Sequence, residues 1–224
     1  MIDIIYLAFN RLEFTKASMA TMLVNTEWAN VRKLVIYDDG SIDGTREYLK
    51  SVRCPVPTEF VFWKYGGPVA IMNHYLRSKP TEIFAKIDND TMLPPSWLSE
   101  CLKIMETHPK IDLLGIESFF PVAAGRATRG YVVARHIGGI GLMRTKCFKS
   151  LPRANGRFGF TMWQHQNKQI LKAWINPSLP VFLLDKLSGE PWASLSNSYV
   201  GKGWQRKCAR YDDTKSAMWQ WWKP

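Results

Sequence analysis

Two carboxylates separated by one residue form a candidate metal site. Asp88 and Asp90 flank Asn89, directly after the apolar run 82–87. Mg²⁺ and Mn²⁺ prefer hard oxygen ligands, and one or two carboxylates commonly hold them together with substrate phosphates. A cation there would neutralise charge on a departing phosphate. The alternative is a turn capped by aspartates, but the strand before the motif and Pro94-Pro95 after it favour the metal site.

Three further segments could hold the other parts of a phosphorylated ligand. Asp38-Asp39-Gly40-Ser41 places a carboxylate where it could accept a hydrogen bond from a base or a ribose hydroxyl. Ala8-Phe9-Asn10-Arg11 offers a backbone edge and a cation for a base and a phosphate. Residues 64–73 contain Gly66-Gly67 before a predicted helix, whose N–H groups could face an anion, although loop punctuation explains these glycines equally well.

The elements that must position these residues alternate between strand and helix. Apolar runs predict strands over 2–9, 34–37, 60–63, 82–87 and 113–116, with helices over 12–24, 41–52, 69–76 and 94–107. Either Ser41 or Asp43 is expected to be the N-cap of the second helix. The alternation predicts an α/β fold with a mostly parallel sheet and helices on both faces. Ligands bind beyond the carboxyl ends of such strands, so the polar clusters should converge on one edge.

Four of these motifs, in this order, resemble the nucleotide-sugar glycosyltransferases of family 2, which have the GT-A fold. They are Phe9-Asn10-Arg11, residues 37–45, Gly66-Gly67 with Asn73, and residues 87–90. The resemblance covers about residues 1–120 and implies a nucleotide-diphosphate sugar donor, most often a UDP-sugar, with Mn²⁺ or Mg²⁺.

The same resemblance implies roles for individual residues. Asp39 would contact the uracil or ribose, and Asp88 and Asp90 would form the metal motif, with Asp90 the firmer ligand. The predicted nucleotide-sugar site comprises Ala8, Asn10, Arg11, Asp39, Lys64, Gly67, Asn73 and Asp88.

The resemblance weakens after residue 120. Residues 137–144 look like the family's acceptor-side strand, which would make Arg144 an acceptor-binding residue. Inverting members then carry a Glu-Asp pair whose aspartate is the general base, but residues 159–165 contain no carboxylate. His165 and Asp185 are the two candidate bases, the first because its ordinary pKa is near neutrality.

Other interpretations of these two residues stay open. His165 could instead be a third metal ligand or a surface histidine. Asp185 could serve only in an ion pair, and a retaining enzyme would need no classical base.

Charge divides the 224-residue chain into two halves. Residues 1–120 contain 13 Lys+Arg and 15 Asp+Glu, whereas residues 121–224 contain 17 and 4, with seven of the ten tryptophans. We therefore predict a nucleotide-sugar and metal-binding half, 1–120, and a basic, Trp-rich acceptor-binding half, 121–224, of one domain. The basic half should meet a polyanion or a membrane surface, unless its charge only aids solubility.

Cations and aromatic side chains alternate near the C-terminus. Lys202, Trp204 and Arg206 suit a nucleic-acid strand, whose phosphates meet the cations and whose bases stack on the rings. The same composition suits the headgroup zone of a membrane. Trp163 and Trp174 are expected in the core, whereas Trp219, Trp221 and Trp222 fit either place.

Composition excludes several classes of protein. A hydrophobic fraction of 46% excludes a mainly disordered chain. No run of about 18 uncharged apolar residues predicts a membrane-spanning helix, and residues 1–10 do not resemble a secretory signal. The four cysteines are widely spaced, so we expect reduced, mostly buried thiols and a cytoplasmic protein, in the host cytoplasm if it is viral. No obligate protein partner is inferred.

These observations predict a metal-dependent glycosyltransferase that moves a sugar to a hydroxyl acceptor, with the metal stabilising the leaving diphosphate. The first acceptor to consider is DNA with 5-hydroxymethylpyrimidines, as used by viral (phage) DNA-modifying glycosyltransferases, which requires base extrusion. One alternative is synthesis of cell-surface polysaccharide or lipopolysaccharide at a membrane face. The other is a non-catalytic nucleic-acid-binding module. The sugar, its stereochemistry and the oligomeric state stay open.

Overall fold

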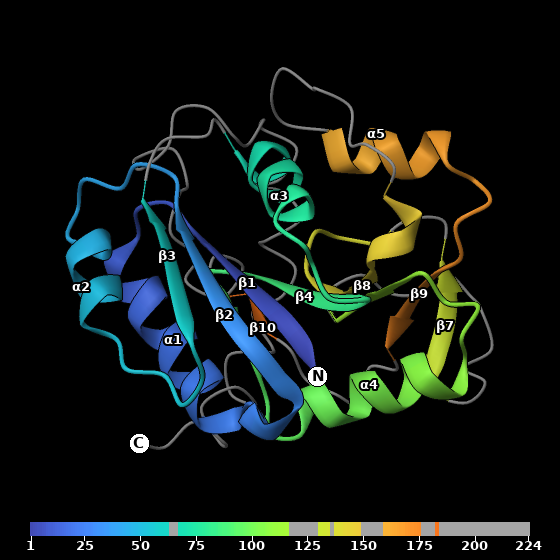
Figure 1. Cartoon of the computed structure of the whole chain (residues 1–224), viewed down its shortest axis with the longest axis horizontal. Helices are drawn as coiled ribbons and strands as arrows, with labels where there is room; N and C mark the ends of the chain where they lie inside the picture. Colours follow the sequence, from blue (N-terminus) through green and yellow to red (C-terminus); the bar gives the residue numbers. More distant parts are fainter. Residues whose placement is uncertain (63–66, 117–129, 135–136, 149–158, 176–181, 184–224) are drawn as a thin grey trace, which may run out of the picture.

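An eight-stranded sheet carries most of the described chain (Figure 1). The computed structural model describes residues 1–62, 67–116, 130–134, 137–148, 159–175 and 182–183. In spatial order the strands are β3 (Thr58–Phe62), β2 (Val31–Asp38), β1 (Ile2–Ala8), β4 (Ile83–Asp88), β8 (Gly141–Arg144), β6 (Leu113–Gly115), β9 (Lys172–Ile175) and β7 (Tyr131–Ala134). A separate two-stranded sheet pairs β5 (Thr91–Met92) with β10 (Phe182–Leu183).

Most strands of the large sheet run in one direction. The pairs β1–β2, β1–β4, β2–β3 and β6–β9 are parallel. Strand β8 runs antiparallel between β4 and β6, and β7 is antiparallel to β9. This arrangement confirms the predicted mostly parallel α/β sheet.

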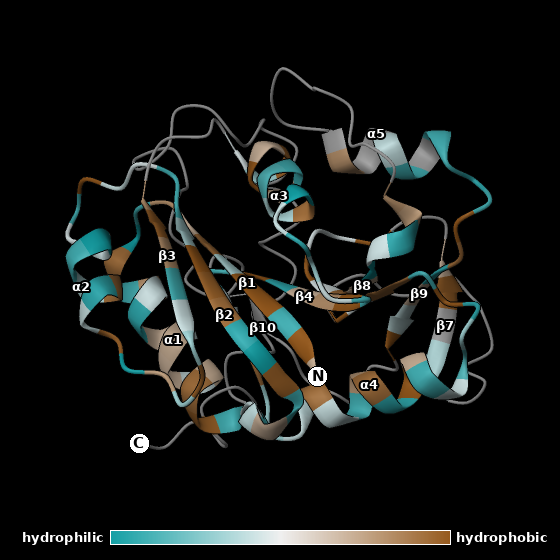
Figure 2. Ribbon diagram, viewed as in Figure 1, coloured by the Kyte–Doolittle hydropathy of each residue, from teal (hydrophilic) through white to brown (hydrophobic). Residues whose placement is uncertain are grey.

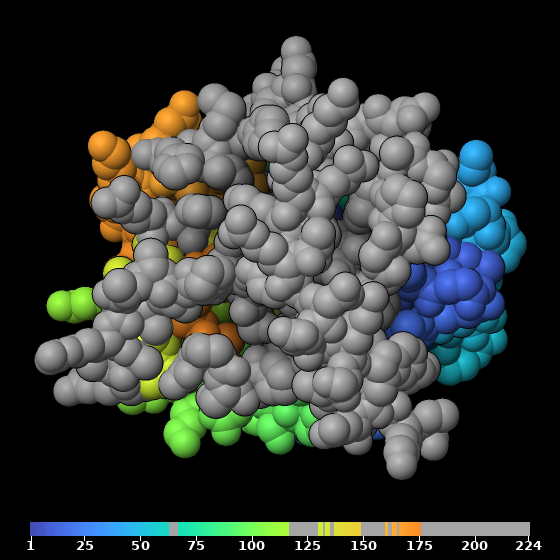
Figure 3. Space-filling model, turned by 180° about the vertical axis from the view of Figure 1, so that it is seen from behind, coloured from blue at the N-terminus to red at the C-terminus, as the bar shows by residue number. Residues whose placement is uncertain are grey.

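Helices cover both faces of this sheet. They are α1 (Leu12–Asn25), α2 (Thr45–Ser51), α3 (Pro68–Arg77), α4 (Trp97–Thr107) and α5 (Gly159–Gln166), with short 3-10 turns at Trp28–Asn30 and Thr145–Cys147. Seen from behind, α5 and the N-terminal segments lie on opposite sides of the molecule (Figure 3).

Two hydrophobic clusters follow from the alternation of side chains along the strands, because successive residues point to opposite faces. On one face, Ile4 and Tyr6 of β1 join buried residues of α1, α2 and α4. On the other, Ile5 and Leu7 of β1 join buried residues of α3 and α5. The central strands are accordingly among the most hydrophobic segments (Figure 2). The sheet is thus buried on both faces, as is usual for mostly parallel sheets, and the loops at its carboxyl edge leave from a packed core.

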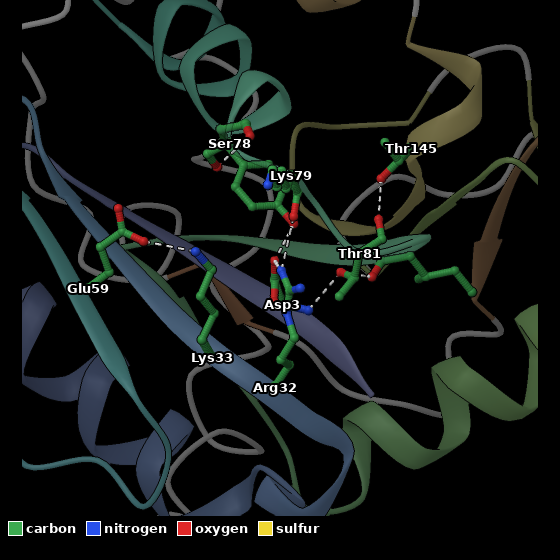
Figure 4. Close-up of polar contacts among 10 residues, drawn as sticks. Asp3, Arg32, Lys33, Glu59, Ser78, Lys79, Thr81 and Thr145 are labelled. Carbon is green, nitrogen blue, oxygen red and sulfur yellow. Dashed lines mark hydrogen bonds and ion pairs between the residues drawn. The ribbon is translucent and has the colours of Figure 1, made fainter.

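A buried carboxylate paired with an exposed arginine lies at the amino edge of the sheet (Figure 4). Arg32 of β2 donates two hydrogen bonds to the carboxylate of Asp3 in β1, at 2.8 and 2.6 Å. The Tyr75 hydroxyl of α3 donates a third at 2.9 Å, and burial raises the pKa of Tyr75, which keeps it a donor. The network compensates the buried Asp3 charge and joins two strands to a helix at the amino end of the sheet.

Two helix starts differ from the sequence prediction. The helix predicted from residue 94 begins at Trp97, after Ser96 adopts a left-handed conformation with φ 61°. The helix predicted from residue 41 begins at Thr45, because Gly44 turns the chain with φ 93°. Ser41 is therefore not its N-cap. Asp43 lies one residue before the N-cap position, Gly44, and its carboxylate accepts a hydrogen bond from the Thr45 N–H of α2 at 3.1 Å.

The Asp43 carboxylate serves two helices at once. It also accepts the Leu12 N–H at the start of α1, at 3.0 Å. Burial alone would raise the pKa of Asp43, but its hydrogen bonds with Thr45 and Leu12 outweigh this and lower the pKa. The charged form is therefore stabilised at the positive ends of two helix dipoles.

We predict that Asp43→Ala lowers the free energy of unfolding by about 1 kcal/mol at neutral pH, as expected for loss of a helix cap. Because the folded pKa lies below the unfolded value of about 3.9, this contribution is present above that pH. It is lost as pH falls through the folded pKa. Urea titrations at pH 7 and pH 3 check this. The control is Glu59→Ala on β3, an exposed carboxylate outside the helices, which should change the free energy of unfolding little at either pH. An equal difference at both pH values would contradict the prediction.

The second half of the chain adds strands to the same large sheet. Of residues 137–144, which look like the family's acceptor-side strand, only Gly141–Arg144 form a strand. Phe182–Leu183 form a short strand that pairs with β5. The sequence analysis missed β7 and β9, which are only four residues long. The predicted core positions of Trp163 and Trp174 are confirmed, since both are buried. The two-half division of the domain stays a prediction.

The three described cysteines, Cys54, Cys101 and Cys147, are free thiols, as predicted. Cys101 is buried, and the other two are half-buried. Burial raises the pKa of all three, to about 12 for Cys147, so they stay protonated at neutral pH. Cys208 lies outside the described residues.

Candidate functional site

The predicted polar clusters meet at the carboxyl edge of three neighbouring strands. Strand β1 lies between β2 and β4, with Ala8 opposite Asp38 and Leu7 opposite Asp88 in register. The backbone pairing continues one residue further on each side, since Asp39 N–H donates to Ala8 O and Asn89 N–H donates to Leu7 O, both at 2.9 Å. The loops after β1, β2 and β4 therefore leave the sheet at the same level.

Asn10 ties the three loops together. Its N–H donates to Ser41 Oγ at 2.7 Å, and its side-chain oxygen accepts the Ile42 N–H at 2.9 Å. Its carbonyl accepts a hydrogen bond from Asn89 Nδ2 at 2.8 Å. Asn10 and Arg11 both adopt left-handed conformations, with φ 53° and 64°, which are uncommon for residues other than glycine. The hydrogen bonds hold this strained turn, so the Asn10 side-chain oxygen has a structural use besides the predicted ligand contact.

The two adjacent aspartates after β2 have different environments. Asp38 is fully buried and accepts hydrogen bonds from Arg46 Nε at 2.6 Å and from the Ser41 N–H at 3.1 Å. It therefore holds the turn and α2. Asp39 is only half-buried, at the edge where the sheet ends. This geometry leaves Asp39, rather than Asp38, placed to contact a ligand.

Each carboxylate of the predicted metal motif has a cation beside it. Lys86 Nζ lies 2.5 Å from Asp88 Oδ1, and Arg11 Nη1 lies 2.9 Å from Asp90 Oδ2. The Asp88 side chain is 31% exposed and the Asp90 side chain 15%. Asn89, between them, turns inward and donates to Thr15 Oγ1 at 2.8 Å. The alternation places both carboxylates at the edge and the amide in the interior.

The donor set fits a divalent cation that takes its other ligands from a bound diphosphate. Asp88 and Asp90 supply hard oxygen atoms, and Mg²⁺ is usually held by one or two carboxylates plus substrate phosphates. Among the described residues, no group of three or more His, Cys, Asp or Glu side chains could hold a metal ion.

The structure places Arg144, which was predicted to bind the acceptor, away from the other predicted site residues. Arg144 pairs with Ile83 at the amino end of β4, away from the polar edge. Its guanidinium is buried and donates to the carbonyls of Ile111 and Met105, at 2.9 and 2.6 Å, and to Glu82 at 3.2 Å. Because β8 runs antiparallel to β4, its last residue lies at the opposite edge from the site. Arg144 therefore joins α4 to the sheet.

Helix α3 carries two other predicted site residues. Gly67 precedes the helix with φ 118°, a backbone conformation that would be strained for a residue with a side chain. Its carbonyl accepts a hydrogen bond from the Ile71 N–H. Asn73 is half-buried on the helix, beside His74. The Tyr37 hydroxyl and His74 Nδ1 lie 3.1 Å apart, which joins α3 to the end of β2.

The remaining predicted residues lie outside what the structure describes. His165 belongs to α5, but its side chain is not described. Lys64, Asp185, Lys202, Trp204 and Arg206 all fall outside the described residues.

The sequence analysis missed Lys86 and Thr15 at this edge, and it named Ser41 only as part of the motif 38–41 and as a candidate helix cap. Only Lys86 had a recognisable signal, because a lysine within an otherwise apolar strand, two residues before a carboxylate, points to a buried ion pair. Ser41 and Thr15 are small hydroxyl residues whose roles depend on which loops meet.

A family model described as "Glycosyl transferase family 2" matches residues 3–155. No curated protein sequence matches the chain. Among solved structures, TarS of S. aureus has a TM-score of 0.59 at 15% sequence identity and covers 78% of this chain and 35% of its own. A shorter TarS structure, of residues 1–349 in complex with UDP-GlcNAc, has a TM-score of 0.58 at 15% identity and covers 77% of this chain and 57% of its own.

Two other similar structures contain a nucleotide and manganese. The mannosyltransferase PcManGT from Pyrobaculum calidifontis, with GDP-Man and Mn²⁺, has a TM-score of 0.59 at 14% identity, over 76% of this chain and 53% of its own. GalNAc-T7, with UDP, GalNAc and Mn²⁺, has a TM-score of 0.59 at 12% identity, over 84% of this chain and 45% of its own. The chain thus spans between about a third and three fifths of these structures, and the likeness shows a shared fold. None of the described helices is both long and apolar enough to cross a membrane.

Proposed function

The chain belongs to glycosyl transferase family 2, and from this premise we propose that it transfers a sugar from a nucleotide-diphosphate sugar to a hydroxyl acceptor with the help of Mn²⁺ or Mg²⁺. The observation that carries the proposal is the convergence of Asp39, Asp88 and Asp90 at one edge of the sheet, where Asn10 joins the loops. Membership of this enzyme family displaces the alternative of a non-catalytic nucleic-acid-binding module.

The arrangement assigns separate tasks to separate loops. Asp39 would accept a hydrogen bond from the base or ribose of the nucleotide, while Asp88 and Asp90 would hold the cation. When bound, the cation stabilises negative charge on the leaving diphosphate. Arg11 lies 2.9 Å from Asp90 and brings a positive charge to the same end of the site. A UDP-sugar is the first donor to test, since two of the similar structures contain UDP or UDP-GlcNAc, and a GDP-sugar is the second.

The base that activates the acceptor hydroxyl is part of the proposal. His165 and Asp185 stay the candidates, and a retaining reaction would need neither. The stereochemistry of the product distinguishes these routes.

For the acceptor we propose a polyanion, on the charge of residues 121–224, which contain 17 Lys+Arg against 4 Asp+Glu. DNA with 5-hydroxymethylpyrimidines is the first to test, with Lys202, Trp204 and Arg206 as proposed contacts. An anionic or lipid-linked surface glycan, with peripheral membrane contact, is the second. Charge alone supports this step.

The test measures release of nucleoside diphosphate from a panel of UDP- and GDP-sugars with Mn²⁺, with and without 5-hydroxymethylcytosine DNA. Unmodified DNA of the same sequence is the control. Release stimulated only by modified DNA, and weakened steeply by salt, supports the DNA acceptor. Slow hydrolysis that DNA does not stimulate supports the transferase and redirects the search to glycans. No release and no binding with any donor would contradict the proposed function.

A further inference from the structure

Lys86 is a buried cation in the middle of the sheet. It lies in β4, between Ile5 of β1 and Gly141 of β8, and its side chain is 2% exposed. Lysine is almost never fully buried unless it is paired, because removing an ammonium group from water is costly. Its position therefore calls for a specific partner.

The partner is a predicted ligand of the nucleotide-sugar and metal. Lys86 and Asp88 are two residues apart on one strand, so their side chains share a face of the sheet. Nζ contacts Asp88 Oδ1 at 2.5 Å, while no described residue donates a hydrogen bond to Oδ2. The buried cation thus holds one oxygen of a carboxylate whose side chain is 31% exposed.

The backbone around Gly139 is shaped to admit this ammonium group. A Cβ at Gly139 would lie 3.2 Å from Lys86 Nζ and 3.9 Å from Cε. Gly139 is therefore the position at which the chain leading into β8 passes over the Lys86–Asp88 pair. A larger residue there would press on the ammonium group.

Lys172 provides a contrast within the same sheet. It is also buried in a strand, but its Nζ donates to the backbone carbonyls of Asn167 and Ile170, at 3.2 and 2.8 Å. Burial lowers the pKa of Lys172, against the opposing effect of Asp112. Lys172 thus stabilises a turn, whereas Lys86 is bound to a side chain of the candidate site.

We propose that Lys86 is a positioning residue: it holds Asp88 by Oδ1 and thereby presents Oδ2 to the bound metal and nucleotide. This inference rests on the proposed function, because Asp88 is a ligand only in that reaction. Without the ammonium group the carboxylate could rotate, and ligand binding would have to reorder it. Loss of such a supporting contact typically weakens metal affinity or activity by about 10- to 100-fold.

The experiment titrates Mn²⁺ into the full chain in the presence of uridine diphosphate, and in a second series guanosine diphosphate. Electron paramagnetic resonance measures free Mn²⁺, and this readout does not depend on turnover. Lys86→Met should weaken Mn²⁺ binding by about 10- to 100-fold, and Lys86→Arg, which keeps the charge, should restore part of it. Lys172→Met is the matched control and should leave Mn²⁺ affinity unchanged even if its melting temperature falls.

Gly139→Ala tests the same contact should Lys86→Met fail to fold. Its Cβ would lie 3.2 Å from Nζ, so the ammonium group must shift by a few tenths of an ångström, which should weaken its contact with Asp88 and lower the Mn²⁺ affinity measurably. The melting temperature shows whether the variant is folded. If Lys86→Met is folded and binds Mn²⁺ as tightly as the wild type, the positioning role is wrong. If Lys86→Met is unfolded, wild-type Mn²⁺ affinity in Gly139→Ala would overturn the role instead. Wild-type protein that binds no Mn²⁺ with either nucleotide would instead overturn the proposed function.

Discussion

Asp90→Ala is expected to lower kcat by about 100- to 1,000-fold, because the carboxylate would hold the cation that stabilises the leaving diphosphate. Its side chain is 15% exposed at the carboxyl edge of the sheet, beside Arg11. Asp90→Asn keeps the shape but removes the charge, so it should lose most of the same activity. Initial rates of nucleoside diphosphate release at saturating donor and Mn²⁺ check this.

Asp90→Ala also removes the ion-pair partner of Arg11, so a control must distinguish a loss of catalysis from a loss of folded structure. Glu59→Ala removes an exposed carboxylate paired with Lys33 on the neighbouring strand, and it should leave kcat unchanged. Melting temperatures of both variants should stay close to that of the wild type. Turnover within a few-fold of the wild type in a folded Asp90→Ala would exclude Asp90 as a metal ligand.

Gly141→Ala is expected to destabilise the fold by about 3 kcal/mol or more, through backbone strain and overpacking. Gly141 has φ +145°, and a Cβ there would lie 2.1 Å from the carbonyl oxygen of Leu114. That oxygen belongs to β6, which pairs with β8 at this position. Moving either strand to relieve the clash would therefore break hydrogen bonds between β6 and β8. Urea unfolding followed by circular dichroism measures the change.

Gly130→Ala is the matched control because it shares the positive φ without the clash. Its φ is +83°, and the nearest atom to a Cβ would be Ile104 Cδ1 at 3.8 Å. It should therefore show only the conformational cost of an alanine in the left-handed region, about 1 to 2 kcal/mol. Equal losses in the two variants would show that φ, and not the contact with Leu114, sets the cost.

Local patterns were sufficient for the first half of the chain. Runs of apolar residues identified β1, β2 and β4 and, with helical spacing, α1 and α3, within a residue or a few of their observed ends. Tertiary contacts decided the ends: Gly44 delays α2 to Thr45. In the second half, strands of four residues carry too little periodicity to be recognised, and only pairing with neighbours makes them strands.

The sequence by itself determined the fold class, the edge of the sheet that carries the candidate site and the motif at Asp88 and Asp90, since hydrophobic periodicity and strand ends are local properties. Only the tertiary structure decided which side chains serve the site. It buried Asp38 against Arg46 and left Asp39 accessible. It placed Arg144 at the edge of the sheet opposite the candidate site, because β8 pairs antiparallel with both β4 and β6. It also placed the Lys86 ammonium group against Asp88, since the partner of a buried charge depends on the packing that removes water from around it.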